Sequence, residues 1–219
     1  MSTVSKLLIV IVFLVVGSVG AMTARQVFVV DESTDIPVPE INGFVLQQPR
    51  VLPEFALLDG HARAFARSDF VGAWSLLYFG FTYCPDICPT AMVEMAKLKD
   101  LLAASRPDVA VEYYLVSVDP QRDTPERIQE YVTYFDDSFK GLTGDLLEIG
   151  KLAQTASVIH VIEPSADGAS YEVGHSSTLT LLDPQGNIRA IFKEPLRASA
   201  LANDIDRVLT YVEHVSNEI

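Results

Sequence analysis

A buried strand followed by an amphipathic helix is the clearest pattern of hydrophobic and polar positions in this chain. Residues 74–80 (WSLLYFG) are aromatic or aliphatic with little interruption, which is typical of a strand buried on both faces. Apolar residues between 92 and 102 then recur at spacings of three and four, which predicts a helix. The pattern therefore predicts a core strand and a helix joined by residues 81–89.

Strands and helices are expected to alternate along the rest of the chain. Short strands are predicted at 54–58, 111–118, 157–162, 170–173, 177–182 and 188–192, with a short strand and loop at 63–70 and a short edge element at 142–144. Helices are predicted at 124–135, 145–156 and 198–214. In the first of these helices Thr124 suits the N-cap and Pro125 the first helical position. This succession indicates an α/β arrangement.

The N-terminal residues carry an uncharged apolar run at positions 7–24. Its length is about 18 residues, the lower limit for a membrane-spanning helix. We expect a signal anchor over residues 1–24 with Lys6 on the inner side; the alternative is a signal peptide cleaved near the small residues 19–21. The run is longer than the usual core of a signal peptide, which favours the anchor. Both alternatives place the following domain on the far side of the membrane, outside the cytoplasm.

Residues 25–50 are rich in proline and acidic side chains, which predicts a tether, and residues 51–219 are expected to form one folded domain. The net charge of −13 argues against nucleic acid and against anionic lipid surfaces, since both attract basic proteins. It is compatible with a cationic cargo such as a metal ion, although solubility alone also explains it.

The chain contains two cysteines, Cys84 and Cys88, and they occur where the predicted core strand becomes a helix. Thioredoxin-like folds carry their chemistry at this position, but the spacing here is C-x-x-x-C. If the helix begins near Cys84, the two sulfurs lie on one face of it, where they can meet each other or bind a shared ion. A cysteine at a helix N-terminus gains thiolate character, which suits both nucleophilic attack and binding of soft ions. The pair is thus a redox couple, a pair of metal ligands, or both.

Of the four histidines, His175 is the candidate third ligand. It precedes the predicted core strand, and in a thioredoxin-like sheet that strand end lies beside the cysteine helix. Two cysteinates and one imidazole suit Cu(I), and with a water they suit Cu(II). A structural zinc site requires a fourth protein ligand; His160 could supply one, but nothing in the sequence places it close. His61 and His214 are expected to be surface residues.

Four segments of the chain resemble the SCO/SenC family. Residues 78–89 (YFGFTYCPDICP) are similar to the family signature, and 117–126 (SVDPQRDTPE), 141–144 (GLTG) and His175 with 182–186 (LDPQG) agree with further blocks in the same order. The resemblance covers roughly residues 50–216.

The resemblance implies a thioredoxin-like fold, with a central mixed sheet flanked by helices, behind one N-terminal transmembrane helix. Family members are copper proteins implicated in assembling the CuA centre of cytochrome c oxidase, and their copper ligands map onto Cys84, Cys88 and His175. The implied partners are the copper-bearing oxidase subunit and other copper chaperones. The implied location is the bacterial inner membrane, with a single-pass anchor and the domain facing the periplasm.

Several residues near the predicted site depart from the family or admit two interpretations. Gly174 stands where relatives often have an acidic residue, and Ala156 and His160 stand where relatives often have tyrosines. These departures concern the surroundings of the metal rather than its ligands. Asp86 and Asp119 either serve partner docking and tuning of the thiols, or cap a helix and begin a turn.

Two functions follow from the same cysteines. The first is a copper metallochaperone that hands its metal to an oxidase subunit by ligand exchange. The second is a thiol-disulfide oxidoreductase, in which one cysteine attacks a partner's disulfide and the other resolves the mixed disulfide. A peroxiredoxin-like peroxidase is disfavoured because the sequence lacks the Pro-x-x-x-Thr/Ser-x-x-Cys arrangement.

Overall fold

The computed structural model describes residues 37–164 and 171–217; from Val38 onward these belong to one compact unit. The predicted membrane segment at 1–24 and residues 25–36 of the predicted tether lie outside the described residues. Within these residues no helix is both long and apolar enough to cross a membrane.

The unit is built on an eight-stranded mixed sheet with the strand order β1-β10-β9-β4-β5-β6-β2-β3. The strands are β1 (Gly43–Val51), β2 (Leu57–Asp59), β3 (Ala64–Phe65), β4 (Trp74–Gly80), β5 (Val111–Ser117), β6 (Lys140–Gly144), β9 (Leu179–Leu182) and β10 (Asn187–Phe192). The three central strands β4, β5 and β6 are parallel, and the other neighbours pair antiparallel. The mixed sheet predicted from the sequence is confirmed.

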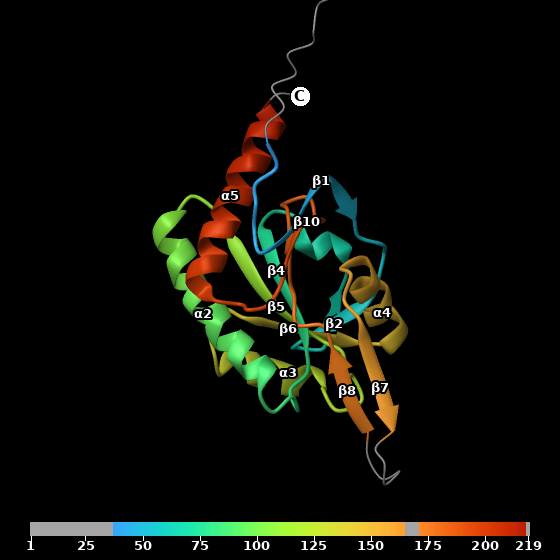
Figure 1. The fold of residues 1–219 in the computed structure, drawn as a ribbon. Coiled ribbons are helices and arrows are strands. Elements are labelled where there is room, and N and C mark those ends of the chain that lie inside the picture. The colour runs from blue at the N-terminus through green and yellow to red at the C-terminus, as the bar shows by residue number, and fades with distance from the viewer. Residues whose placement is uncertain (1–36, 165–170, 218–219) are drawn as a thin grey trace, which may run out of the picture. The chain divides into compact units, whose positions relative to one another are not determined.

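Helices cover both faces of this sheet (Figure 1). They are α2 (Ile87–Ser105), α3 (Pro125–Thr133), α4 (Leu146–Thr155) and α5 (Ala198–Asn217), with a 3-10 turn η1 (Arg67–Phe70). In Figure 1, α2 and α5 pack side by side on one side of the sheet, and α4 lies on the other. The predicted cap of α3 is confirmed, since the Thr124 hydroxyl accepts the Arg127 amide at 3.3 Å.

The core lies between β4 and α2, as the hydrophobic pattern predicts. All seven residues of β4 are buried, so both faces of this strand are covered. On α2 the side chains of Met92, Met95 and Leu98 are fully buried. These residues fix where β4 ends and α2 begins, and the cysteine segment spans that junction.

Two predictions about strand positions are wrong. Residues 43–50, expected in the tether, form strand β1 together with Val51 and pair antiparallel with β10. Pro49 is tolerated there because an edge strand can spare one N–H, and the register shifts between Val45 and Arg50. Residues 142–144, expected at an edge, belong to β6, which lies inside the sheet between β5 and β2. The strand is short, but its partners on both sides bury it.

A separate two-stranded sheet carries the candidate histidine. Strands β7 (His160–Pro164) and β8 (Tyr171–His175) pair antiparallel with each other and with no other described strand. Exposure alternates along both strands, with residues 160, 162, 171, 173 and 175 partly covered and their neighbours exposed. The ribbon therefore turns one face toward the body of the domain and one toward solvent.

Candidate metal centre

The sheet topology brings the cysteines and His175 to the same edge. Strand β4 leaves the sheet at Gly80, four residues before Cys84, and β9 runs antiparallel to it with Leu179 opposite Tyr78. An antiparallel neighbour enters the sheet where β4 leaves it. The chain segment just before β9, which contains His175, therefore meets the segment just after β4.

The three candidate ligands converge on one point. The Cys88 Sγ atom lies 3.3 Å from His175 Nε2, and the Cys88 backbone amide donates to Cys84 Sγ at 3.4 Å. The ligand atoms of all three residues lie within 4.8 Å of one another. Cysteine spacing and a histidine 87 positions further on thus produce one compact dithiol–imidazole group.

The cysteines differ from the expected helical pair. Helix α2 begins at Ile87, so Cys84 precedes the helix and sits in a turn in which its amide donates to the Phe81 carbonyl at 3.2 Å. Asp86 occupies the N-cap position, but its side chain makes no capping hydrogen bond among the described residues. Its carbonyl accepts the Thr90 hydroxyl at 2.9 Å instead. Capping by the Asp86 carboxylate, one of the two roles considered for this residue, is therefore wrong.

The expected thiolate character does not hold for Cys88. Burial raises the pKa of the Cys88 thiol, because the thiolate anion would lose its hydrating water. The hydrogen bond with Cys84 raises this pKa further. Burial also lowers the pKa of His175, so its imidazole is neutral at neutral pH. His175 Nδ1 lies 3.1 Å from the Ser176 carbonyl, which can only accept, so Nδ1 carries the proton. Nε2 then presents a lone pair to Cys88, and the metal-free pair is neutral.

Three aromatic or hydroxyl-bearing side chains surround this pair, those of Tyr78, Phe81 and Ser177. The Tyr78 hydroxyl is 3.0 Å from Ser177 Oγ and makes a long contact of 4.0 Å with Cys88 Sγ. The rings of Tyr78 and Phe81 meet the His175 ring edge-on, at centroid distances of 6.0 and 5.7 Å. The imidazole is thus confined in orientation on two sides. Strand alternation places Tyr78 on the same face of β4 as Gly80, beside Cys88, and this spacing is the sequence signal that could have pointed to Tyr78.

The loop that leads to the cysteines is fixed by a buried carboxylate. Asp123 accepts the Thr82 amide at 3.0 Å, the Thr82 hydroxyl at 2.6 Å and the Ser117 hydroxyl at 2.6 Å. Charge-assisted hydrogen bonds of this kind are the strong ones in proteins. Asp123 thus ties the end of β5 to the segment between β4 and Cys84.

A second buried carboxylate, Asp119, connects the same region to the β7–β8 ribbon. Its Oδ1 accepts the Tyr171 hydroxyl at 2.7 Å, and its Oδ2 pairs with the Arg122 guanidinium. Arg122 also lies over the Tyr171 ring, with Cζ 4.3 Å from the centroid, and near the Tyr83 ring at 5.0 Å. The turn considered for Asp119 is confirmed, since its backbone carbonyl accepts hydrogen bonds from the amides of Arg122 and Asp123. The carboxylate has the additional role of holding the strand that carries His175.

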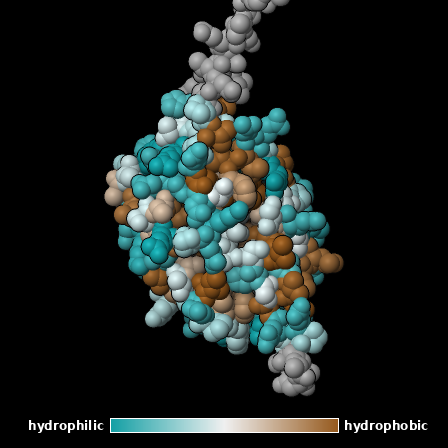
Figure 2. Space-filling model, viewed as in Figure 1, coloured by the Kyte–Doolittle hydropathy of each residue, from teal (hydrophilic) through white to brown (hydrophobic). Residues whose placement is uncertain are grey.

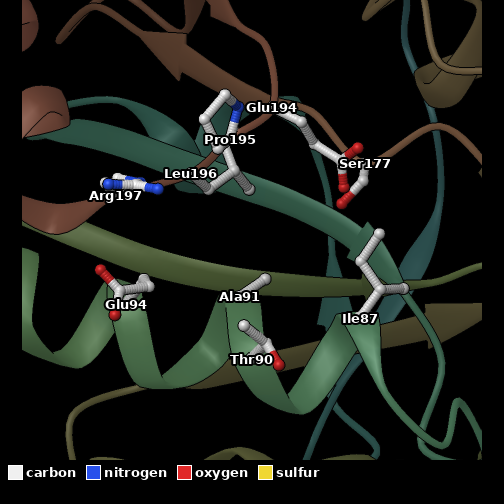
Figure 3. A pocket seen from close by; sticks show the side chains of 9 residues that line it. All are labelled: Ile87, Thr90, Ala91, Glu94, Ser177, Glu194, Pro195, Leu196 and Arg197. Atoms are coloured by element: carbon white, nitrogen blue, oxygen red, sulfur yellow. The ribbon is translucent and has the colours of Figure 1, made fainter.

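A groove of about 450 Å³ runs along α2 beside the centre (Figure 3). Ile87 and Ala91 of α2 line one side of it, and Ser177 and Leu196 line the other. Ile87 is adjacent in sequence to Cys88, so the groove reaches the rim of the centre. Exposed apolar side chains also occur on the solvent side of the ribbon and just before it, where Val161 is 45% and Ile159 71% exposed. Figure 2 shows hydrophobic side chains on the side where α4 and β7 lie.

The donor set fits a soft metal ion. Metal–sulfur and metal–nitrogen bonds of about 2.3 and 2.0–2.1 Å allow donors around one ion to lie up to ~4.6 Å apart. The three ligand atoms, within 4.8 Å of one another, need only small side-chain adjustments to meet that limit. Two thiolates and an imidazole favour Cu(I) over hard cations such as Mg²⁺. His61 and His214 are exposed surface residues, as expected.

Comparison with known proteins agrees with this architecture. The SCO1/SenC family model matches residues 45–210. A "Putative copper-binding protein" of Stutzerimonas stutzeri is 33% identical over 170 residues, which cover 78% of this chain and 82% of that protein. The "Protein SCO2 homolog, mitochondrial" of Bos taurus is 33% identical over 154 residues, which cover 70% of this chain but 58% of the relative.

Among solved structures, Arabidopsis thaliana ScoI with copper bound superposes with a TM-score of 0.68 at 30% identity, covering 74% of this chain and 99% of that one. Fold and site together define a thioredoxin-like protein with a dithiol–imidazole centre. The chain belongs to the SCO1/SenC family.

Proposed function

We propose that this protein is a copper metallochaperone, which binds copper through Cys84, Cys88 and His175 and delivers it to the CuA centre of cytochrome c oxidase. The observation that carries the proposal is the convergence of these three ligand atoms from two distant segments of the chain. Family membership supports the same assignment, as do the copper-bound relative and the relative named for copper binding.

Delivery rather than permanent storage is favoured by the way the donors are arranged. Among the described residues the group contains three donors, and copper that is three-coordinate leaves room for an incoming ligand from a partner. His175 is only partly buried, whereas Cys88 is fully buried. Ligand exchange can therefore begin at the imidazole, with the thiolates released last.

The same proposal includes an N-terminal membrane anchor and an extracytoplasmic site of action. The uncharged run at residues 7–24 supports the anchor, with the domain in the periplasm of a bacterium. Partners there would be the copper-bearing oxidase subunit and the copper chaperones that load this protein. A tether leading to the folded domain would give the centre reach to a membrane-bound recipient.

Thiol-disulfide exchange is the second candidate function. The hydrogen bond from the Cys88 backbone amide to Cys84 Sγ holds the cysteines close to each other, which a disulfide requires. However, the attacking group in such a reaction is an accessible thiolate, and both cysteines are at least nine-tenths buried. Burial also raises the pKa of Cys88. The geometry thus favours metal binding as the main role of the pair.

Copper content and Cu(I) affinity of the full chain test the proposal. The fully reduced chain should bind one copper, and His175→Ala should lower Cu(I) affinity by roughly 10- to 100-fold, since one of three ligands is lost. His214→Ala is a matched control because that imidazole is exposed on α5. A reduced wild-type chain that bound no copper would leave thiol-disulfide exchange as the function.

A further inference from the structure

A second imidazole stands directly opposite His175. In the β7–β8 pair the register places His160 across from His175, followed by Val161 across from Gly174. The sequence could not show this, because 15 positions separate the two histidines and their pairing depends on the register of the ribbon.

The type of pairing brings these two side chains close together. The Ser176 amide donates to the Ile159 carbonyl at 2.8 Å, which makes Ile159 and Ser176 a hydrogen-bonded pair. Hydrogen-bonded and non-hydrogen-bonded pairs alternate along an antiparallel ribbon, so His160 and His175 form a non-hydrogen-bonded pair. Such pairs have the shorter Cα separation, about 4.5 Å, and their side chains share one face.

The shared face is the one directed toward the centre. His175 reaches Cys88 from it, and His160 is partly covered on the same side of the ribbon. The Cβ atoms of such a pair lie about 4.5–5.5 Å apart. Two nitrogens bound to one ion at about 2.0–2.1 Å lie at most ~4.2 Å apart, so this spacing allows both rings to reach one metal. In the structure His160 is not one of the three donors that lie within 4.8 Å of one another, so binding the same ion requires a change in the rotamer of its side chain.

We propose that His160 is a fourth copper ligand, bound when the metal is Cu(II) and detached when it is Cu(I). This inference rests on the proposed function, because it takes copper as the cargo. Cu(I) is satisfied by two thiolates and one imidazole, whereas Cu(II) prefers four donors in a tetragonal arrangement rich in nitrogen. The strand pairing supplies that fourth donor from the protein, directly opposite His175. The centre then distinguishes the two oxidation states of its cargo by coordination number.

The experiment compares the full chain with His160→Gln and with His214→Gln, which removes an exposed imidazole far along the sequence on α5. Each protein is loaded anaerobically with one equivalent of Cu(II) or of Cu(I). Pulsed EPR of the Cu(II) forms should detect two coordinated imidazoles in wild type and in His214→Gln, but one in His160→Gln. Cu(II) affinity of His160→Gln should fall by about 10- to 100-fold, and Cu(I) affinity should stay unchanged.

The outcomes separate this inference from the proposed function. One coordinated imidazole in wild type, or equal Cu(II) affinity in wild type and His160→Gln, would overturn the role of His160 while leaving the chaperone intact. Equal loss of Cu(I) and Cu(II) affinity in His160→Gln would also overturn it, since the ligand would not discriminate oxidation states. A wild-type chain that bound neither ion would contradict the proposed function itself.

Discussion

The two halves of the candidate centre are held in different ways. Cys88 lies at the start of α2, fully buried against β4, and the loop before it is tied down by the Asp123 carboxylate. His175 lies at the end of a two-stranded ribbon outside the main sheet and is partly exposed. Its position depends on side-chain contacts, chiefly from Tyr171 to Asp119 and Arg122.

This difference suggests how one site can both hold and release a metal. The core sets the positions of the two sulfurs, so binding them costs little reorganisation. The ribbon offers the imidazole through few contacts, and elements with few buried contacts open at lower free energy than the core. We therefore expect changes on the cysteine half to affect affinity and stability together, and changes on the histidine half to affect mainly the metal.

The largest effect is expected on the cysteine half. Cys88→Ser replaces a fully buried thiol with a hydroxyl, which is a poor ligand for a soft ion. Cu(I) affinity should fall by about a hundredfold or more, because loss of an outer-shell partner alone costs roughly 10- to 100-fold and here a ligand atom itself is lost. Competition with a Cu(I) chelator measures this loss. A variant that kept wild-type affinity would show that Cys88 does not bind the metal.

Two glycines allow a matched test of the two halves. A Cβ at Gly80 would meet Cys88 Sγ at 2.9 Å and the Tyr78 ring at 3.0 Å, whereas a Cβ at Gly174 meets open space. Gly80→Ala should cost about 1–3 kcal/mol of unfolding free energy, because the packed core cannot take the methyl group, and should also weaken copper binding.

The control, Gly174→Ala, should be neutral or stabilising by up to about 0.5–1 kcal/mol, because it reduces the backbone freedom of a strand residue. Denaturant unfolding of the metal-free proteins measures both changes. Equal destabilisation by the two substitutions would contradict the contrast between core and ribbon.

The pH dependence of copper binding should come from the cysteine half. The pKa of Cys88 is raised by burial, so at neutral pH copper must displace its proton; the pKa of His175 is lowered, so the imidazole loses none. Each displaced proton makes affinity rise about tenfold, or 1.4 kcal/mol, per pH unit. Isothermal calorimetry in buffers of different ionisation enthalpy counts the protons. Binding that released none near pH 7 would contradict the neutral thiol.

The smallest effect is expected for Tyr171→Phe. The change removes the 2.7 Å hydrogen bond from the Tyr171 hydroxyl to Asp119. A hydrogen bond to a charged group usually contributes about 1.5–3 kcal/mol to stability. We expect about half of that, roughly 1 kcal/mol, because Tyr171 is partly exposed to solvent. The ribbon should exchange its amide hydrogens faster, and copper affinity should fall severalfold, while the global unfolding free energy changes little. Tyr134→Phe is the control, because that side chain is 86% exposed. Loss of global stability in Tyr171→Phe would show that the ribbon belongs to the cooperative core.

The same division decides what the sequence could predict. Strand β4 and helix α2 follow from hydrophobic pattern alone, since every residue of β4 is buried. The thiolate character expected for the pair failed for Cys88, because burial is a tertiary property that spacing does not reveal. The resemblance indicated His175, but the pairing with His160 needed the ribbon register. Tyr171 lies four residues before His175 on the same strand face, so its role follows from strand alternation once β8 is known.

X-ray absorption of the Cu(I)-loaded full chain tests the central claim most directly, because it counts the donor atoms around the metal. We expect two sulfur ligands and one nitrogen ligand, from Cys84, Cys88 and His175, and loss of the nitrogen in His175→Ala. Two sulfurs with no nitrogen in the wild-type protein would rule out His175 as a ligand, because the ribbon would then take no part in binding the metal.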